Sequence, residues 1–193
     1  MGRQAKAWAL GWLALTLALG GARFEARAAE VAAPAEPSAY RLDDYRSPTP
    51  ATLKGATVVT SGEAMALWRT KAASFIDVMP RPHRPANLPP QSVWHVPDHD
   101  SIPGSLWLPN TGYGVLSPAM AAHFEHSLAG LTKGDRAAPL LFYCLRNCWM
   151  SWNAAKRALE LGYRRVFWFP EGIEGWSEIG GALEPATPVE PAP

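Results

Sequence analysis

The sequence predicts an α/β fold: one domain with a mainly parallel sheet flanked by helices. Short apolar runs rich in β-branched and aromatic residues alternate along the chain with segments of helical periodicity. This alternation is typical of strands joined by crossover helices, which cover the faces of a parallel sheet. The 193 residues show no internal repeat, and the length left after an expected leader is enough for one domain with a real core.

The first 28 residues have the pattern of an export signal peptide. Arg3 and Lys6 form a short basic region, residues 7–19 are apolar, and Ala26-x-Ala28 is a small-x-small cleavage site. The apolar run is shorter than the about 20 residues that a membrane-crossing helix needs, so an uncleaved anchor is the weaker interpretation. We expect cleavage after Ala28, a periplasmic protein, and membrane contact only through the leader.

The ends of the mature chain differ in composition from its middle. Residues 29–51 are rich in Ala, Pro, Ser and Glu and are predicted to form a linker or N-terminal arm, with Tyr40, Leu42 and Tyr45 able to dock on the domain. The domain itself is expected at 52–183. The Pro-, Glu- and Ala-rich residues 184–193 are predicted to be a disordered tail.

The first half of the domain is predicted to form a strand, a helix and a second strand, followed by a long loop. Residues 57–60 are β-branched, and Ser61 after them can cap a helix. Residues 74–79 are apolar around one acid, Asp77, and indicate a buried strand. Residues 80–103 are punctuated by Pro and His, which is typical of a surface loop.

The second half of the domain is predicted to continue the alternation. Ser117-Pro118 places a cap before Pro at the first helical position, which predicts a helix to about Leu128. Residues 171–180 are rich in Gly and Trp and are expected to be a loop or a short turn. The remaining elements are three strands and a helix: strands 105–108, 140–143 and 166–169, and a helix over 151–161.

Charge argues against a nucleic-acid partner. The chain has 18 Lys and Arg against 17 Asp and Glu; the leader removes four basic residues and one acidic residue, which leaves 14 minus 16, a net charge of −2. Binding to nucleic acid calls for a basic patch. The histidine pairs His95/His99 and His123/His126 are each short of the ligands that a metal site needs, so no metal site is predicted.

The two cysteines of the chain, Cys144 and Cys148, lie between a strand end and a helix start. Unpaired backbone N–H groups and the positive end of the helix dipole at such a place favour a thiolate or another sulfur anion. This segment is therefore the candidate site. In an oxidising periplasm the two thiols pair with each other or remain reduced, because the chain has no other cysteine.

Four short motifs follow one another along the chain. They are an acid at a strand end, an H-x-x-I-P-G-S segment, a Tyr-Cys loop with the helix after it, and a closing G-x-x-x-W segment: Phe75–Val78, His99–Ser105, Tyr143–Val166 and Glu171–Gly180. In this order and spacing they resemble a rhodanese domain, over about residues 52–183. The Cys-x-x-x-Cys-Trp pattern resembles a narrower group of exported proteins associated with alcohol catabolism by quinoproteins, which use pyrroloquinoline quinone.

The resemblance implies that Cys144 carries sulfur. Such a cysteine takes sulfane sulfur from a small donor, thiosulfate or a persulfide, holds it as a persulfide, and passes it to a thiol acceptor without a cofactor. Amides at the start of the following helix stabilise the anion. Asp77 and Trp176 are expected to support the site. The resemblance implies the following residues for the substrate-binding loop: Leu145, Asn147, Trp149, Met150 and Ser151.

The loop departs from the family pattern in two ways. Met150 stands where an Arg is common, and the loop is one residue longer, as in phosphatase-like relatives. Those relatives need an Arg to bind an oxyanion in a bidentate manner, so phosphatase chemistry is not expected here. Arg146, inside the loop, is a further catalytic candidate: it can attract thiosulfate or lower the pKa of Cys144, or it is a solvated charge.

Cys148 allows two interpretations. As a resolving thiol it attacks a Cys144 persulfide and leaves a disulfide, which strain across a tight loop makes easier to reduce. As a structural residue it packs at the helix start. Four tryptophans near the loop form either a pocket over the cysteine or, as we favour, core packing: Trp149, Trp152, Trp168 and Trp176.

Three functions are consistent with these observations. The first is sulfur carriage on Cys144, and the second is thiol–disulfide exchange between Cys144 and Cys148. The third is a non-catalytic periplasmic accessory module of a quinoprotein system, with the cleft holding a ligand or partner. The link to a quinoprotein rests wholly on the resemblance.

Overall fold

A computed structural model describes Gly2, residues 33–82 and residues 84–191. The predicted leader, residues 1–28, lies outside the described residues apart from Gly2. The chain divides into two units, 1–31 and 32–193, and the second contains all the helices and strands described below. Over the described ranges, no helix is both long and apolar enough to cross a membrane.

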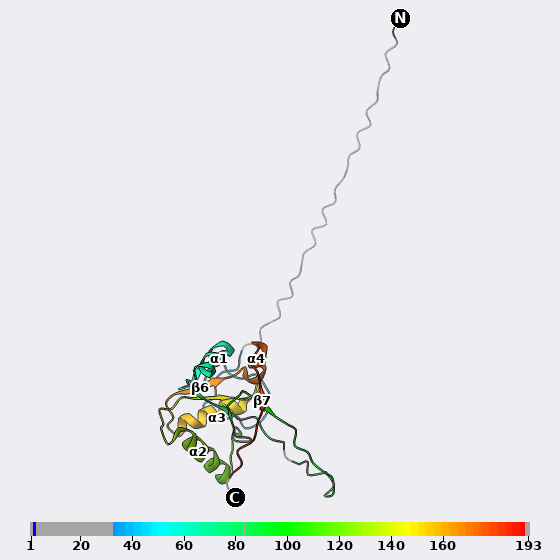
Figure 1. Cartoon of the computed structure of the whole chain (residues 1–193), viewed down its shortest axis with the longest axis vertical. Coiled ribbons are helices and arrows are strands. Elements are labelled where there is room, and N and C mark those ends of the chain that lie inside the picture. The colour runs from blue at the N-terminus through cyan, green and yellow to red at the C-terminus, as the bar shows by residue number, and fades with distance from the viewer. Residues whose placement is uncertain (1, 3–32, 83, 192–193) are drawn as a thin grey trace. The chain divides into compact units, whose positions relative to one another are not determined.

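A five-stranded parallel sheet forms the centre of the domain, in the order β1-β6-β5-β2-β4 (Figure 1). Every neighbouring pair in this sheet is parallel, which confirms the predicted fold class. The central strand is apolar throughout and buried, as expected where helices cover both faces. The strands are β1 (Thr57–Val58), β2 (Ser74–Asp77), β4 (Leu106–Trp107), β5 (Leu140–Tyr143) and β6 (Val166–Phe169).

Four helices cover the sheet, two on each face (Figure 1). Side chains from α1 and α4 pack into one core cluster, and those from α2 and α3 into the other. The helices are α1 (Ser61–Arg69), α2 (Pro118–Thr132), α3 (Trp149–Glu160) and α4 (Gly172–Glu178).

The alternation of side chains along the strands builds these two cores. Ile76, Phe142 and Trp168 are in register across β2, β5 and β6 and face α2 and α3. Phe75 and Leu141, one position earlier, face α1 and α4. Each fully buried side chain of this size contributes about 1.5–3 kcal/mol. The sheet therefore gives the cysteine loop, which follows β5, a rigid support.

The helix starts follow their capping residues. Thr60, not the predicted Ser61, caps α1: its hydroxyl accepts from the N–H of Glu63, and the Glu63 carboxylate accepts from the N–H of Thr60. This reciprocal capping box satisfies two otherwise unpaired donors, so the helix begins where it does. Ser117 caps α2 as predicted, with Pro118 in the first turn.

Two helices differ from their predicted extents. Helix α3 begins at Trp149 rather than at 151, because Cys148 takes the cap position. Helix α2 continues past Leu128 to Thr132 and ends where Lys133 adopts a left-handed conformation, with φ of 52°. In place of the loop or turn expected at 171–180, the chain forms the short helix α4.

The C-terminal segment is held against the domain, where composition predicted disorder from residue 184. Strand β7 (Glu184–Pro185) pairs antiparallel with β3 (Asp100–Ser101). Beyond it, the N–H of Ala186 donates to the carbonyl of His99 at 2.8 Å and the N–H of Val189 to the carbonyl of Trp107 at 2.9 Å. A proline-rich strand is tolerated at a sheet edge, because its missing donors face away from the ladder.

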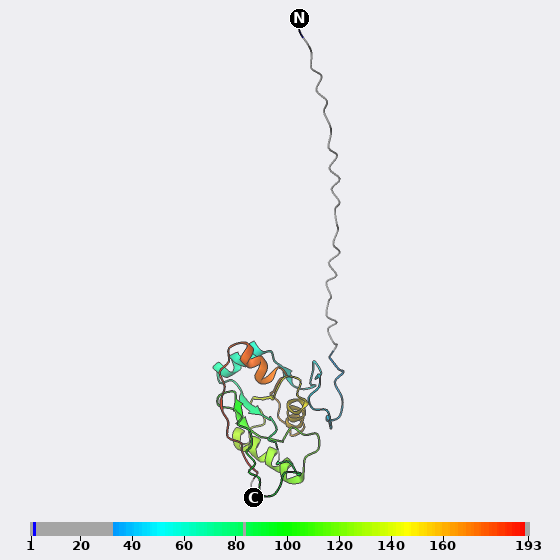
Figure 2. The ribbon, with the colours of Figure 1, turned by 90° about the vertical axis from the view of Figure 1, so that its right-hand side faces the viewer.

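The N-terminal arm docks on α3 (Figure 2). The backbone N–H and C=O of Arg41 bond to the Asn153 side chain at 3.0 and 2.9 Å. The Arg157 guanidinium lies 4.7 Å from the centre of the Tyr40 ring. The arm predicted from composition therefore has fixed contacts with the helix that follows the cysteines, at least from residue 40 on.

The segment from 80 to 99 has no helix or strand among its described residues and runs away from the sheet, in green in Figure 1. Arg84 stabilises its turn, because its guanidinium donates to the carbonyls of Pro89 and Ser92. The predicted long loop is present, and its last residues form β3.

Candidate functional site

The cysteine loop joins β5 to α3 and encloses a small cavity. Cys144 follows β5 directly, and Cys148 is the residue before α3. Both are free thiols, with exposed fractions of 0% and 2%. The cavity beside them has a volume of about 70 Å³. It is lined by Tyr45, Arg46, Met79, Pro80, Cys144, Leu145, Cys148 and Met150.

Helix α4 approaches the loop closely and fixes its first turn. The carbonyl of Cys144 accepts from the N–H of Ile173 at 3.0 Å. Gly172 has φ of 54°, and a Cβ there would lie 2.2 Å from the Cys144 carbonyl oxygen. Only glycine fits both the backbone conformation and this approach. Asn147 at the loop tip is also left-handed, with φ of 53°, which Asn tolerates better than most residues.

The two cysteines have opposite pKa shifts. The neighbouring Cys144 thiol, helped by the N–H groups of Met150 and Leu145, lowers the pKa of Cys148 to about 7. Burial, and then the proximity of Cys148, raises the pKa of Cys144 well above its ordinary value. Of the two thiols, Cys148, at the start of α3, is therefore the one that ionises first.

Asp77 supports the wall of the cavity through a buried network. One carboxylate oxygen lies 2.7 Å from His99 Nε2 and accepts from the Ser101 hydroxyl at 2.7 Å. The other accepts from the N–H of Met79 at 2.8 Å. The sulfur of Met79 in turn accepts a hydrogen bond from the Cys144 thiol at 3.8 Å. Asp77 thus acts on the cysteines through Met79, and its charge also raises the pKa of Cys144.

The predicted loop cation lies away from the cavity. The Arg146 guanidinium binds the Glu178 carboxylate with two hydrogen bonds, of 2.7 and 2.5 Å. The N–H of Arg146 donates to Glu174 at 2.8 Å. Arg146 therefore ties the loop to α4 and is not among the residues that line the cavity.

The other residues predicted for the loop have three different positions: in the wall of the cavity, at the exposed tip of the loop, and in the core beneath Cys148. Leu145 and Met150 line the cavity, whereas Asn147 is exposed. Ser151 is buried: its hydroxyl donates to the carbonyl of Cys148 at 3.1 Å and accepts from the Trp168 indole at 3.0 Å. This pair of bonds braces the backbone beneath Cys148.

The four tryptophans near the loop are buried in the core and do not line the cysteine cavity: Trp149, Trp152, Trp168 and Trp176. Trp176, a predicted supporting residue, packs edge-on against Trp68 and Phe75, and its indole donates to Ala182 at 2.8 Å. Trp149 is different, because its indole donates to Ser47 of the arm at 3.1 Å.

Sequence reasoning missed four of the lining residues. Met79 and Pro80 follow β2, and Tyr45 and Arg46 belong to the arm. The sequence predicts that Tyr45 docks on the domain, because its side chain is aromatic. No local pattern marks Arg46, because the cysteines beside it in the cavity lie about 100 residues further along the chain.

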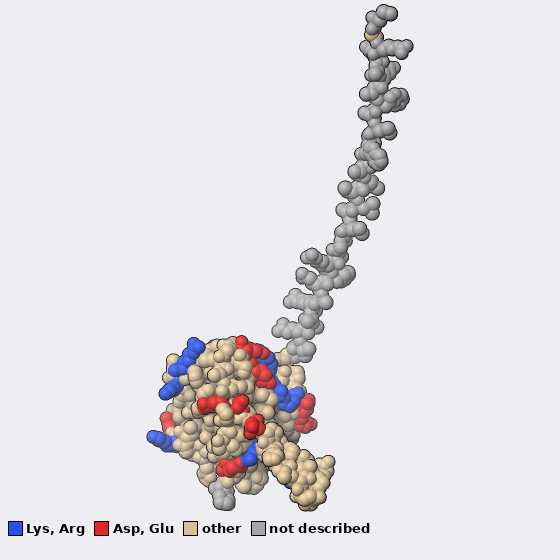
Figure 3. Space-filling view, turned by 45° about the vertical axis from the view of Figure 1, so that its right-hand side comes forward, with Lys and Arg blue, Asp and Glu red and all other residues tan. Residues whose placement is uncertain are grey.

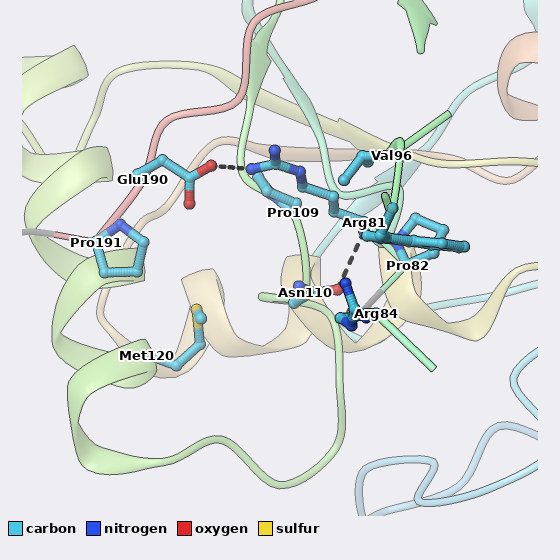
Figure 4. Close-up of a pocket in the computed structure, with 10 residues that line it drawn as sticks. Arg81, Pro82, Arg84, Val96, Pro109, Asn110, Met120, Glu190 and Pro191 are labelled. Atoms are coloured by element: carbon cyan, nitrogen blue, oxygen red, sulfur yellow. Dashed lines mark hydrogen bonds and ion pairs between the residues drawn. The ribbon is translucent and has the colours of Figure 1, made fainter. Parts of the chain in front are cut away.

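A second cavity, of about 260 Å³, lies under the C-terminal segment (Figure 4). Arg81 lines this cavity, and its guanidinium forms an ion pair with Glu190. The backbone N–H of Arg81 donates to the Asn110 side chain at 3.1 Å. Charges of both signs are mixed over the face in Figure 3. No group of three metal-ligating side chains is found within 33–82 and 84–191.

Comparison with protein families matches residues 60–179 to the rhodanese-like domain. No curated protein gives a significant match. Among solved structures, a Rhodopseudomonas palustris protein of unknown function, titled a possible tyrosine phosphatase, is 20% identical with a TM-score of 0.45; the match covers 67% of this chain and 85% of that one.

Two further structures are similar at the same level. A thiosulfate sulfurtransferase from Pseudomonas aeruginosa is 18% identical with a TM-score of 0.43, over 69% of this chain and 21% of that chain. A protein from Bacillus halodurans is 19% identical with a TM-score of 0.43, over 67% of this chain and 77% of that chain.

Proposed function

Because the chain belongs to the rhodanese-like domain family, we propose that it carries sulfane sulfur as a persulfide on Cys144. One observation carries the proposal: the loop between β5 and α3 holds two buried free thiols beside a cavity that admits only a small group. Exclusion of water protects a persulfide from side reactions.

Sulfur loading begins with a proton transfer inside the pair. The Cys148 thiolate takes the thiol proton of Cys144, so that Cys144 becomes the nucleophile. The Cys144 thiolate attacks the outer sulfur of thiosulfate, the sulfur–sulfur bond of the donor breaks, and sulfite leaves with the electron pair. The product is an anionic Cys144 persulfide, and the amides of Leu145 and Met150, which lower the pKa of Cys148, are available to stabilise it.

Sulfur delivery reverses these roles. The thiolate of a small acceptor attacks the outer sulfur of the Cys144 persulfide, and the Cys144 thiolate leaves. Cys144 then recovers its proton from Cys148. In this cycle Cys148 stores the proton that Cys144 gives up.

The position of both cysteines at one cavity also favours a second candidate, thiol–disulfide exchange. The Cys148 thiol gives its proton to the outer sulfur of the Cys144 persulfide and attacks the inner sulfur. The sulfur–sulfur bond of the persulfide breaks, a Cys144–Cys148 disulfide forms, and hydrosulfide leaves. An external dithiol is then needed to reduce the disulfide.

We further propose that the protein is exported and works in the periplasm beside a quinoprotein oxidation system, as an enzyme or as an accessory module. The leader pattern supports export, and the Cys-x-x-x-Cys-Trp pattern supports the quinoprotein link. Cell fractionation tests the first part: the mature chain is expected in the periplasmic fraction with Ala29 at its N-terminus, and full-length chain in the cytosol argues against it.

The unreduced intact mass, measured before and after incubation with thiosulfate, tests the sulfur-carrier function. We expect a gain of one sulfur that maps to Cys144 and is absent in Cys144→Ser. A mass two hydrogens below that of the dithiol, with no sulfur gained, favours the disulfide candidate. An unchanged dithiol mass overturns both and leaves the accessory role.

A further inference from the structure

The cation at the cysteine cavity comes from the N-terminal arm. Arg46 lines the cavity together with Cys144 and Cys148, and its side chain is exposed to solvent. Arg46 lies outside the region that matches the family, residues 60–179. The site is therefore completed by a segment that the family pattern does not include.

Trp149 holds the arm on both sides of Arg46. The backbone N–H of Trp149 donates to the carbonyl of Tyr45 at 2.9 Å, and its indole N–H donates to the hydroxyl of Ser47 at 3.1 Å. The residue directly after Cys148 thus fixes the two neighbours of Arg46 in the chain. The bond to Tyr45 also satisfies one of the free N–H groups at the start of α3.

Tyr45 adds a second attachment at the same point. Its ring packs edge-on against Tyr113 with 5.3 Å between ring centres, and its hydroxyl accepts from the N–H of Gly114 at 3.1 Å. The backbone at Arg46 is therefore held in place on the domain, while the Arg46 side chain is exposed to solvent.

Arg46 is available to a ligand. In the described part of the chain, no acidic side chain forms an ion pair with it, whereas Arg81 pairs with Glu190 and Arg146 with Glu178. A guanidinium presents paired N–H donors that match the oxygens of a sulfonate or carboxylate.

We propose that Arg46 is the anion-binding residue of the cysteine site and that Trp149 is the positioning residue that keeps it there. The ligand class is a small anionic sulfur donor, whose charged oxygens bind Arg46 at the cavity mouth while its outer sulfur reaches the cysteines. This assignment deepens the proposed sulfur-carrier function and rests on it for the identity of the donor. It gives the tryptophan of the Cys-x-x-x-Cys-Trp motif a specific role.

Alkylation by two reagents of similar size and different charge tests the assignment without any sulfur transfer. The rates with anionic iodoacetate and neutral iodoacetamide are measured on the full mature chain, with the modified cysteine mapped by mass. We expect the iodoacetate-to-iodoacetamide rate ratio to fall about five- to tenfold in Arg46→Gln. Arg46→Lys is expected to recover part of it.

The matched control is Arg164→Gln, which removes an equal charge from an exposed arginine away from the cavity. It should leave the rate ratio unchanged. An equal ratio in Arg46→Gln and the wild type overturns the assignment, and so does a wild-type protein that neither reagent modifies in its native fold. If thiosulfate does not load sulfur, the proposed sulfur-carrier function is wrong, but the alkylation rate ratio can still be measured. The failure of that function and the failure of the Arg46 assignment are therefore distinguishable.

Trp149→Phe tests the positioning role, since it keeps an aromatic ring but loses the indole bond to Ser47. The rate ratio is expected to fall in the same direction as in Arg46→Gln, by a smaller factor. In an Arg46→Gln background the same change should have no further effect on the ratio. A further fall of equal size in that background shows that Trp149 acts independently of Arg46 and overturns its positioning role.

Discussion

The Cys144 thiol lowers the pKa of the neighbouring Cys148 to about 7, while its own hydrogen bond, of 3.8 Å, is donated to the sulfur of Met79. Cys148 lies at the start of α3, where backbone N–H groups favour negative charge. Cys144 follows β5 in a fully buried position, and burial raises its pKa well above the ordinary value. The two thiols are therefore expected to ionise at different pH.

The reactivity of Cys148 should depend on pH near neutrality. Because its pKa is lowered to about 7, the thiolate fraction rises as pH increases through that value. The rate of alkylation by iodoacetamide, mapped to Cys148, is therefore expected to rise with a midpoint near pH 7. A midpoint close to that of an ordinary thiol would contradict the charge division between the two sulfurs.

Replacing Cys144 by Ala should raise the pKa of Cys148. The neighbouring Cys144 thiol makes the largest contribution that lowers this pKa, and alanine removes it. Thiolate absorbance in the ultraviolet, followed against pH, measures the shift. The lowered pKa of Cys148 contributes native stability that is present above the ordinary thiol pKa and lost as pH falls through about 7.

Gly172→Ala should destabilise the protein and distort the loop. The new Cβ meets the carbonyl of Cys144 in a left-handed backbone, so we expect a loss of about 2–4 kcal/mol in the free energy of unfolding. Gly104→Ala is the matched control: its φ is 78° but nothing lies within 4 Å of the added Cβ, so only the backbone cost of about 1–2 kcal/mol applies. Urea denaturation compares the two variants.

Asp77→Asn should weaken both the fold and the cavity wall. The buried carboxylate serves His99, Ser101 and Met79 at once, and an amide cannot accept all these bonds. We expect a loss of about 2–4 kcal/mol in the free energy of unfolding. Unchanged stability in denaturant would show that this network is not a support of the site.

Arg146→Gln should leave sulfur loading nearly unchanged. Its guanidinium is already paired with Glu178 and does not face the cavity. We expect the KM for thiosulfate to stay within about twofold of the wild-type value, as is usual for loss of an exposed ion pair. A large rise in KM would show that Arg146 binds the substrate, which is the role that the sequence allowed for it.

Local patterns accounted for most of the fold but only part of the site. The apolar run of β5 and the Ser117-Pro118 cap of α2 are short-range signals: β5 forms over its predicted residues, and α2 starts where predicted. Arg46 and Met79 reach the cysteines through tertiary packing that no periodicity records. The cap of α1 is different, because the spacing Thr60-x-x-Glu63 is itself a capping-box signature that selects Thr60 over Ser61 in the sequence.

The C-terminal segment has a consequence for solubility. Strand β4 lies at an edge of the five-stranded sheet, and residues 186–189 bond to its backbone and to that of His99. An uncovered edge is a template on which a second chain can add a strand, and so a starting point for aggregation. A chain that ends at residue 183 would keep both cysteines and the strands of the five-stranded sheet yet open this edge, so we expect it to self-associate.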